Sequence, residues 1–96
     1  MANYRLSNTA KEDLIRIHQY GVRKFGIRQA DKYFNDFFKS FDRITNQPYS
    51  FESVNFIKEG YRRCVSGSDS IYFRIENETV EIMTIIGRQD PDEIFK

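Results

Sequence analysis

Apolar residues recur at helical spacing in two consecutive stretches of the first half of the chain. The first stripe consists of Leu14, Ile17, His18, Gly21 and Phe25, and the second of Ala30, Tyr33, Phe34, Phe37, Phe41 and Ile44. Residues three, four and seven positions apart lie on one side of an α-helix, so each stripe predicts an amphipathic helix with a core-facing side. Only Phe25-Gly26-Ile27 separates the stripes, which predicts an antiparallel helix hairpin.

The ends of both helices carry their own signals. Thr9 and Glu12 match a capping box, in which a hydroxyl and a carboxylate satisfy free N–H groups of the first turn. Gly26 is expected to end the first helix in a left-handed conformation, which costs glycine little. The second helix is expected to end near Asn46, before Pro48.

Alternation of apolar and polar residues predicts β-strands at the start and in the second half of the chain. Residues 3–7 form one short alternating stretch. Tyr61–Val65 and Ile71–Ile75 flank a cluster of turn residues at 66–69, which is typical of a β-hairpin.

The stretch Thr79–Ile86 predicts one more strand, which follows a tight turn at 76–78. Val80, Ile82 and Ile86 are expected on one face of this strand, and Met83 and Ile85 on the other. Apolar residues on both faces predict a central strand, and we expect it to pair with the N-terminal strand.

Together these elements predict a single α+β domain over residues 1–96. Its expected order is an N-terminal strand, the antiparallel helix hairpin and a three-stranded antiparallel meander, with the helices packed on one face of the sheet. Residues 47–59 show no period, so we expect a loop packed on the domain edge, with room for a helical turn.

Composition narrows the range of functions. The chain holds fifteen Lys plus Arg and fourteen Asp plus Glu, a net charge of +1. Proteins whose main task is to grip nucleic acid usually carry a strongly basic domain, so this balance argues against that class but leaves room for a local basic patch.

The chain has one cysteine, Cys64, and one histidine, His18, so neither an internal disulfide nor a metal site is expected. We interpret Cys64 as a small core residue of a strand and His18 as a packing residue, and we expect no cofactor. No apolar run approaches the ~18 residues of a membrane span, and no signal peptide is evident. We therefore expect a cytoplasmic protein without a membrane partner.

Two adjacent arginines, Arg62 and Arg63, lie in the first arm of the β-hairpin, where one side chain must point to each face of the sheet. Together with Arg74, they are expected either to pair with Glu76, Glu78 or Glu81 across the strands, or to bind a partner.

The most specific motif is Gly60-Tyr61-Arg62-Arg63-Cys64 followed by Ser66-Gly67-Ser68, and further residues match in register: Ser7, Ala10, Asp13-Leu14, Gly26 and Gln29-Ala30. With these residues nearly the whole chain resembles the ParE toxins of the ParE/RelE superfamily, and hence the toxins of ParDE type II toxin–antitoxin systems. The resemblance implies a RelE/ParE-like fold and a bacterial toxin that is not an enzyme. Such a toxin binds DNA gyrase, stalls it with DNA cleaved and blocks replication. It also implies neutralisation by a ParD-type antitoxin, through which alone the complex contacts operator DNA.

RelE-like toxins of the same superfamily are the alternative, because they cleave mRNA on the ribosome. Their chemistry needs acid–base groups, including a tyrosine near the C-terminus. Here Phe95 stands where that tyrosine is expected, and no tyrosine follows Tyr72. The tail also departs from the ParE pattern, since Gly87 stands where a histidine often follows the last strand. We therefore favour gyrase inhibition over mRNA cleavage.

Two sets of residues are candidates for binding, and no catalytic residue is expected. The antitoxin-binding candidates are Phe38, Arg62, Arg63 and Arg74. The arginines are candidates because the C-terminal segments of such antitoxins are commonly acidic. Phe38 lies beside the apolar stripe, where it either covers the sheet edge or leaves an apolar groove open. The gyrase-binding candidates are Arg88, Gln89, Asp90 and Phe95; the alternative for these residues is a disordered terminus.

Overall fold

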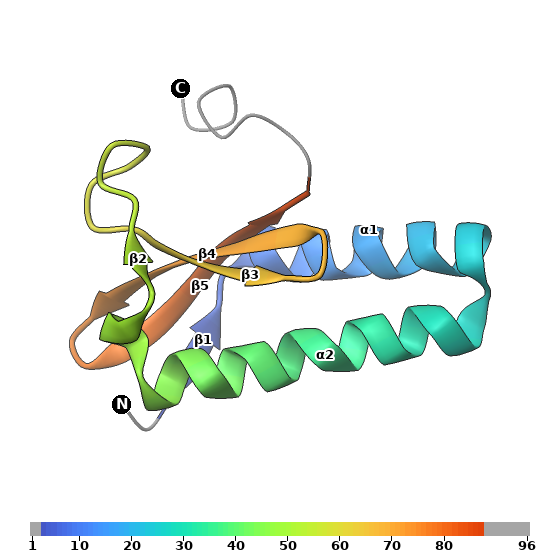
Figure 1. Ribbon diagram of the computed structural model, residues 1–96, viewed down its shortest axis with the longest axis horizontal. Coiled ribbons are helices and arrows are strands. Elements are labelled where there is room, and N and C mark those ends of the chain that lie inside the picture. The colour runs from blue at the N-terminus through green and yellow to red at the C-terminus, as the bar shows by residue number, and fades with distance from the viewer. Residues whose placement is uncertain (1–2, 88–96) are drawn as a thin grey trace.

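The sheet and the helix hairpin form two layers, with both helices on one face of the sheet (Figure 1). The computed structural model describes residues 3–87. Its elements are β1 (Tyr4–Leu6), α1 (Asn8–Phe25), α2 (Ile27–Asn46), the 3-10 turn η1 (Pro48–Ser50), β2 (Glu52–Ser53), β3 (Arg62–Ser66), β4 (Asp69–Glu76) and β5 (Thr79–Ile86). The predicted α+β class and helix packing are confirmed.

The sheet has five strands in the order β1-β5-β4-β3-β2. β1 pairs with β5 in parallel, with Tyr4 opposite Val80, and the other pairs are antiparallel. The expected pairing of the first and last strands is therefore confirmed. β2 corrects the expected loop, because Glu52 pairs with Arg63 and adds an edge strand. Two residues are too few for alternation to reveal a strand.

A β-bulge in β5 changes which side chains reach each face of the sheet. Phe73 lies opposite Ile82 and Tyr72 opposite Thr84, so Met83 is an extra residue in β5. The predicted faces of the last two isoleucines were therefore wrong. Ile85 packs with Val80 and Ile82 under the helices, and Ile86 packs with Tyr72 on the other face. Strict alternation fails wherever one residue is inserted.

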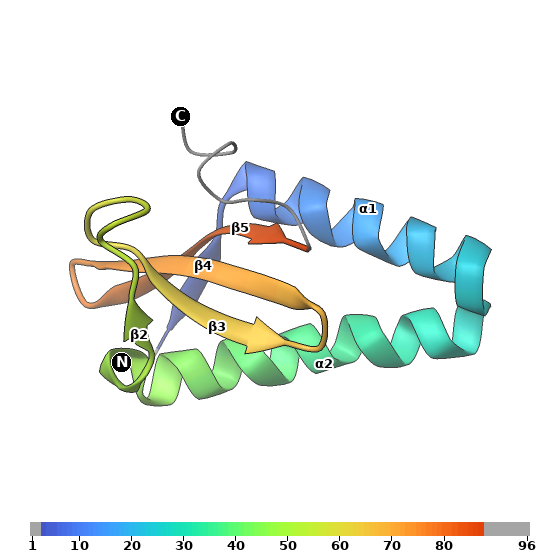
Figure 2. The same ribbon diagram turned by 45° about the horizontal axis from the view of Figure 1, so that its top comes forward.

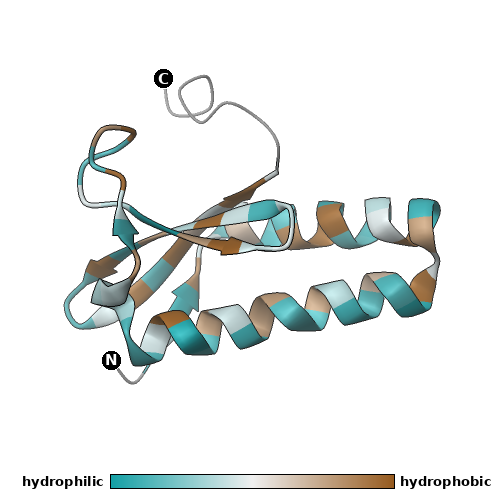
Figure 3. Ribbon diagram, in the orientation of Figure 1, coloured by the Kyte–Doolittle hydropathy of each residue, from teal (hydrophilic) through white to brown (hydrophobic). Residues whose placement is uncertain are grey.

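The main core fills the space between the helices and the sheet. Its buried residues are Ala10, Leu14, Phe37, Phe41, Ile44, Cys64, Ile71, Phe73, Val80, Ile82 and Ile85. A smaller cluster of Val54, Tyr61, Tyr72 and Ile86 lies on the opposite face, next to the segment that joins β2 to β3. Both helices alternate between hydrophobic and hydrophilic segments along their length, as amphipathic helices do (Figure 3).

The helix hairpin projects beyond the sheet at the end where α1 meets α2 (Figures 1 and 2). Gly26 alone connects the helices, at φ +90°, and its N–H donates to the Val22 carbonyl at 3.0 Å. The predicted glycine stop is confirmed. Just before it, a Cβ on Gly21 would lie 3.2 Å from the Ala30 Cβ, so the helices approach closely there.

The start of α1 differs from the predicted capping box at Thr9 and Glu12. Ser7 is the N-cap, because its hydroxyl accepts the Ala10 N–H at 3.0 Å, and Thr9 lies inside the first turn. The helix therefore starts two residues earlier than that motif predicts. Within the described part of the chain, no helix is long and apolar enough to cross a membrane.

Candidate functional site

The adjacent arginines of β3 point to opposite faces of the sheet, as their positions predict. Arg62 lies on the side of its cross-strand partner Phe73, where its Nη1 donates to the Phe51 carbonyl at 2.7 Å. Its guanidinium also lies 5.1 Å from the centre of the Tyr49 ring, within range of a cation–π contact. This arginine is held by a carbonyl and a ring of its own chain.

Arg63 lies on the opposite face, beside Tyr72. Its Nε donates to Glu52 at 2.7 Å and its Nη1 to the Tyr72 hydroxyl at 3.5 Å. The hydrogen bond to Glu52 raises the pKa of Arg63, so this guanidinium stays protonated and positively charged. The contact also ties the short edge strand β2 to the sheet.

Arg74 belongs to a ladder of charges on the same face as Arg63, which we call the sheet ladder: Arg5, Glu81, Arg74 and Glu76. Glu81 accepts from Arg5 at 2.7 Å and from Arg74 at 2.9 Å, and Arg74 also contacts Glu76 at 3.1 Å. The hydrogen bond from Arg5, followed by that from Arg74, lowers the pKa of Glu81. Arg74 pairs with Glu81 across the strands, as expected, whereas Glu76 is a neighbour on the same strand, β4.

Phe38 lies on the helix side of the sheet, away from Arg63 and Arg74. It is partly buried, and its ring centre lies 5.2 Å from that of Phe34 and 5.3 Å from that of Phe41. It packs against the main core. The structure therefore divides the antitoxin-binding candidates between two faces. The gyrase-binding candidates Arg88, Gln89, Asp90 and Phe95 lie outside the described residues.

A cavity of about 510 Å³ opens between the helix hairpin and the β3–β4 turn, and sequence reasoning missed it. We call it the hairpin pocket. Its lining comes from α1 (Arg16, Ile17, His18, Tyr20, Gly21, Phe25), from α2 (Gln29, Ala30, Tyr33, Phe34), from the turn and the first residue of β4 (Ser68, Asp69) and from Gly87. The lining is mainly apolar with a few polar groups, the usual composition of a binding pocket.

Tyr33 lines the hairpin pocket and joins α2 to the β3–β4 turn. Its hydroxyl lies 2.5 Å from Asp69 Oδ2 and 3.1 Å from the Ser66 carbonyl, and the Ser68 N–H donates to it at 3.3 Å. The one hydroxyl proton goes to the shorter contact, the carboxylate. Burial, and then the hydrogen bond to Asp69, raise the pKa of Tyr33, so the phenol stays protonated and holds α2 to the turn.

Gly67 makes this attachment possible. A Cβ at Gly67 would lie 2.6 Å from an edge carbon of the Tyr33 ring, and the backbone has φ +61°. Both the close approach of the ring and the left-handed conformation therefore require glycine.

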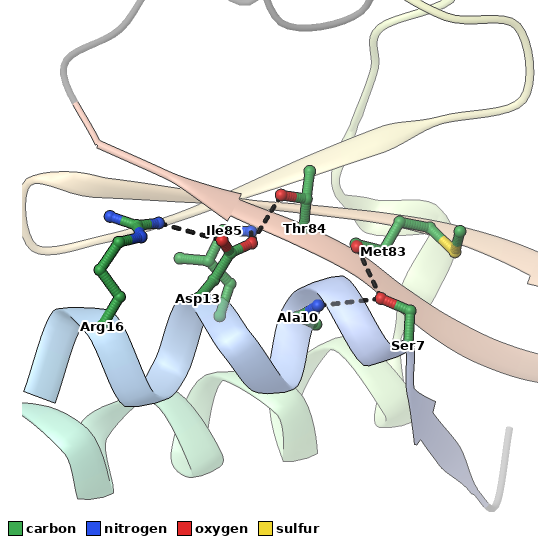
Figure 4. Close-up of polar contacts among 7 residues, drawn as sticks. All are labelled: Ser7, Ala10, Asp13, Arg16, Met83, Thr84 and Ile85. Carbon is green, nitrogen blue, oxygen red and sulfur yellow. Dashed lines mark hydrogen bonds and ion pairs between the residues drawn. The ribbon is translucent and has the colours of Figure 1, made fainter.

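In the other helix of the hairpin, Asp13 attaches α1 to β5 (Figure 4). Its Oδ2 accepts from the Thr84 hydroxyl at 2.7 Å and from the Ile85 N–H at 3.0 Å, and its Oδ1 accepts from Arg16 at 3.0 Å. β1 pairs only as far as Ile82, so beyond that point the carboxylate takes the place of a neighbouring strand.

Ser7 makes a similar contact with the same edge of β5, one residue before Thr84. Its hydroxyl donates to the Met83 carbonyl at 2.7 Å while it caps α1 (Figure 4). The side chains of Ser7 and Asp13 thus satisfy the backbone of the bulged part of β5, which β1 does not reach.

The groups that most often act as nucleophile or base are held in structural contacts. Cys64 is buried, which raises the pKa of its thiol, and Arg43 Nη2 lies 3.6 Å from its sulfur. His18 Nε2 lies 2.7 Å from Asp31 Oδ1, and its ring meets the Phe34 ring edge-on. Within residues 3–87, no group of three or more His, Cys, Asp or Glu side chains could hold a metal ion.

Comparisons with known proteins agree with one another. A family model described as the ParE toxin of the type II toxin-antitoxin system parDE matches residues 4–91. Toxin ParE1 of Caulobacter vibrioides is 34% identical over 86 residues, which cover 90% of this chain and 88% of that protein. Toxin ParE1 of Mycobacterium tuberculosis is 27% identical over 93 residues, 95% of each chain. A solved structure of a chromosomal ParDE TA system from P. aeruginosa has the same fold, with a TM-score of 0.82 at 19% identity over 93% of this chain and 98% of that one.

Proposed function

The chain belongs to the ParE toxins of type II toxin–antitoxin systems, and we propose that it inhibits bacterial DNA gyrase and is neutralised by a ParD-type antitoxin. The observation that carries the proposal is the family match, which extends over residues 4–91 and so includes every described strand and helix. The proposed site of action is the bacterial cytoplasm, where gyrase works.

The contacts of the sheet support action by binding rather than by catalysis. Cleavage of RNA needs groups that can exchange a proton and stabilise a developing charge. Arg63 and Arg74 are instead engaged with carboxylates of their own chain, and burial raises the pKa of the Cys64 thiol. No tyrosine follows Tyr72 in the sequence. We therefore propose a protein inhibitor of gyrase and not a ribonuclease.

A gyrase assay tests this proposal directly. Purified protein is added to gyrase, ATP and relaxed plasmid, and supercoiled and cleaved DNA are measured after denaturation of the enzyme. We expect loss of supercoiling and accumulation of cleaved plasmid. Unchanged supercoiling at stoichiometric excess of the protein would refute the proposal. A parallel translation mixture detects the alternative, because codon-positioned cleavage of mRNA would identify a ribosome-dependent ribonuclease.

For gyrase binding we propose Arg88, Gln89, Asp90 and Phe95. Substitution of Arg88 and Phe95 by alanine is expected to weaken gyrase inhibition while circular dichroism and thermal unfolding stay unchanged. Full inhibition by this double variant would place the gyrase contact elsewhere. The control is Lys11→Ala, which removes an exposed charge from α1.

For antitoxin binding we propose Phe38, Arg62, Arg63 and Arg74. An acidic antitoxin segment would compete for guanidiniums that now contact Glu52, Glu81 and the Phe51 carbonyl. Arg63→Ala is expected to lower the affinity for such a segment, measured by calorimetry. Arg16→Ala is the matched control, because it removes an exposed arginine that is also ion-paired. Equal affinities of the two variants would place the interface elsewhere.

A test of Phe38 needs a conservative substitution, because its ring packs against two other rings. An aspartate there would place a carboxylate beside the Phe34 and Phe41 rings and would weaken the core as well as any interface. Phe38→Leu keeps most of the packing and is the better variant. A lower affinity for the antitoxin segment without a change in unfolding free energy would support the interface.

A further inference from the structure

Positive charge is concentrated at the projecting end of the helix hairpin. Residues 16–32 hold five Lys or Arg and a single Asp, although the whole chain holds fifteen Lys plus Arg and fourteen Asp plus Glu. The rest of the chain is therefore net acidic. We call the projecting end the hairpin tip and define it by Tyr20, Arg23, Lys24, Phe25, Ile27, Arg28 and Lys32, all exposed.

The four cations of the hairpin tip differ from three arginines of the sheet in having no carboxylate partner among the described residues. Arg5, Arg63 and Arg74 each form an ion pair with a glutamate. Within the part of the chain that the structure describes, Arg23, Lys24, Arg28 and Lys32 form no ion pair; Lys24 lies 5.7 Å from the centre of the Tyr20 ring. Asp31, the acidic residue within the stretch 16–32, contacts His18 instead.

An unpaired cluster of cations on a projecting element suits a polyanion. Two features argue against a lipid surface. An interfacial helix needs an apolar face along its length, whereas the apolar stripes of α1 and α2 are largely used in the core. The exposed large apolar side chains of the hairpin tip are Tyr20, Phe25 and Ile27, all within eight residues around the helix connection.

We infer that the hairpin tip binds the phosphate backbone of duplex DNA through Arg23, Lys24, Arg28 and Lys32. The choice of DNA among polyanions rests on the proposed function, since gyrase holds duplex DNA at the place where such a toxin acts. The toxin then touches both the enzyme and its DNA. Contacts to phosphate carry no sequence information, so the binding is independent of DNA sequence and falls steeply with salt.

The test measures fluorescence anisotropy of a short labelled duplex between about 50 and 200 mM salt, without gyrase. One double variant, Lys24→Gln with Arg28→Gln, removes two charges from the hairpin tip. The control, Lys11→Gln with Lys39→Gln, removes two exposed lysines from the same two helices outside the tip and changes the net charge equally. Loss of two phosphate contacts is expected to reduce the slope of log K against log salt by about two, and the control is expected to leave it unchanged.

Equal weakening by both variants would show that only net charge matters and would overturn the inference. So would binding to phosphatidylserine vesicles without binding to the duplex. The outcome separates from that of the proposed function, because the assay contains no gyrase. Inhibition of gyrase without binding of duplex DNA would contradict this inference and leave the proposed function intact. Binding of the duplex through the tip without inhibition of gyrase would contradict the proposed function and leave this inference intact.

Discussion

The half of the helix hairpin that lies on the sheet and the half that projects beyond it share one pair of helices but differ in burial and in charge. On the sheet, Phe37 and Phe41 are completely buried, whereas Phe25 and Ile27 at the hairpin tip are 62% and 60% exposed. Arg5, Arg63 and Arg74 of the sheet are ion-paired, whereas the four cations of the tip form no ion pair with any other described residue. The same helices thus provide stability at one end and an open surface at the other.

Polar contacts reinforce the division. Asp13 ties α1 to the backbone of β5, and Tyr33 ties α2 to the β3–β4 turn. Beyond the sheet the hairpin projects, and there Gly21 of α1 lies close to Ala30 of α2. Substitutions on the two sides of the attachments should therefore separate effects on stability from effects on binding.

Phe37→Ala against Phe25→Ala is the strongest test of this contrast. Removal of the fully buried ring leaves a cavity in the main core and is expected to cost about 3–5 kcal/mol in unfolding free energy. Removal of the exposed ring is expected to change it by no more than about 0.5 kcal/mol. Urea unfolding followed by circular dichroism measures both. A comparable loss from Phe25→Ala would mean that the hairpin tip is part of the cooperative core.

Gly67→Ala tests the attachment of α2. The substitution forces alanine into a left-handed conformation, at about 1–2 kcal/mol, and against the Tyr33 ring, at about 1–3 kcal/mol more. Gly60→Ala is the matched control, because Gly60 has φ +83° with no atom within 4 Å of the added Cβ. We expect Gly67→Ala to lower the thermal midpoint more than Gly60→Ala. Equal shifts would show that Tyr33 moves aside freely.

Asp13→Ala tests the attachment of α1. The Ile85 N–H and the Thr84 hydroxyl lose their acceptor, which is expected to cost about 1–3 kcal/mol in urea unfolding. Glu12→Ala, an exposed carboxylate one position away, is expected to stay within about 0.5 kcal/mol of the parent protein. Amide hydrogen exchange at Ile85 should rise in the Asp13 variant alone. Unchanged exchange there would show that another group takes over the hydrogen bond.

The elements themselves could be predicted because their signals are local. The apolar stripes determine both helices, and Gly26 marks the connection between them. The errors in the sheet arise where a distant partner decides. β2 exists because Glu52 pairs with Arg63, and the bulge at Met83 inverts the faces of Ile85 and Ile86. Neither feature leaves a pattern in its own stretch of sequence.

The candidate site was harder to predict for the same physical reason. Asp13 and Thr84 are 71 positions apart, and Tyr33 and Asp69 are 36 apart, so no spacing rule joins them. The family resemblance includes Asp13 and Gly67, and Gly67 also belongs to the predicted turn, but no contact with α2 or β5 was predicted for either residue. The arginines were better anticipated, because adjacency within a strand alone requires Arg62 and Arg63 to reach opposite faces.

Glu81→Gln gives the smallest expected effect and asks whether paired charge distinguishes the sheet from the hairpin tip. Arg5 and Arg74 hold the pKa of Glu81 below its ordinary value of 4.5. The unfolded chain therefore binds more protons, so the stabilisation is present above about pH 4.5 and is lost as the pH falls through the lower folded value. Because the Arg5 side chain is 64% exposed, the effect is at most about 1 kcal/mol.

Urea unfolding between pH 7 and pH 3 should show a flatter pH dependence for Glu81→Gln. Arg28→Gln, which removes an unpaired charge from the hairpin tip, should follow the parent curve; a matching change there would mean that the tip also stabilises the fold electrostatically.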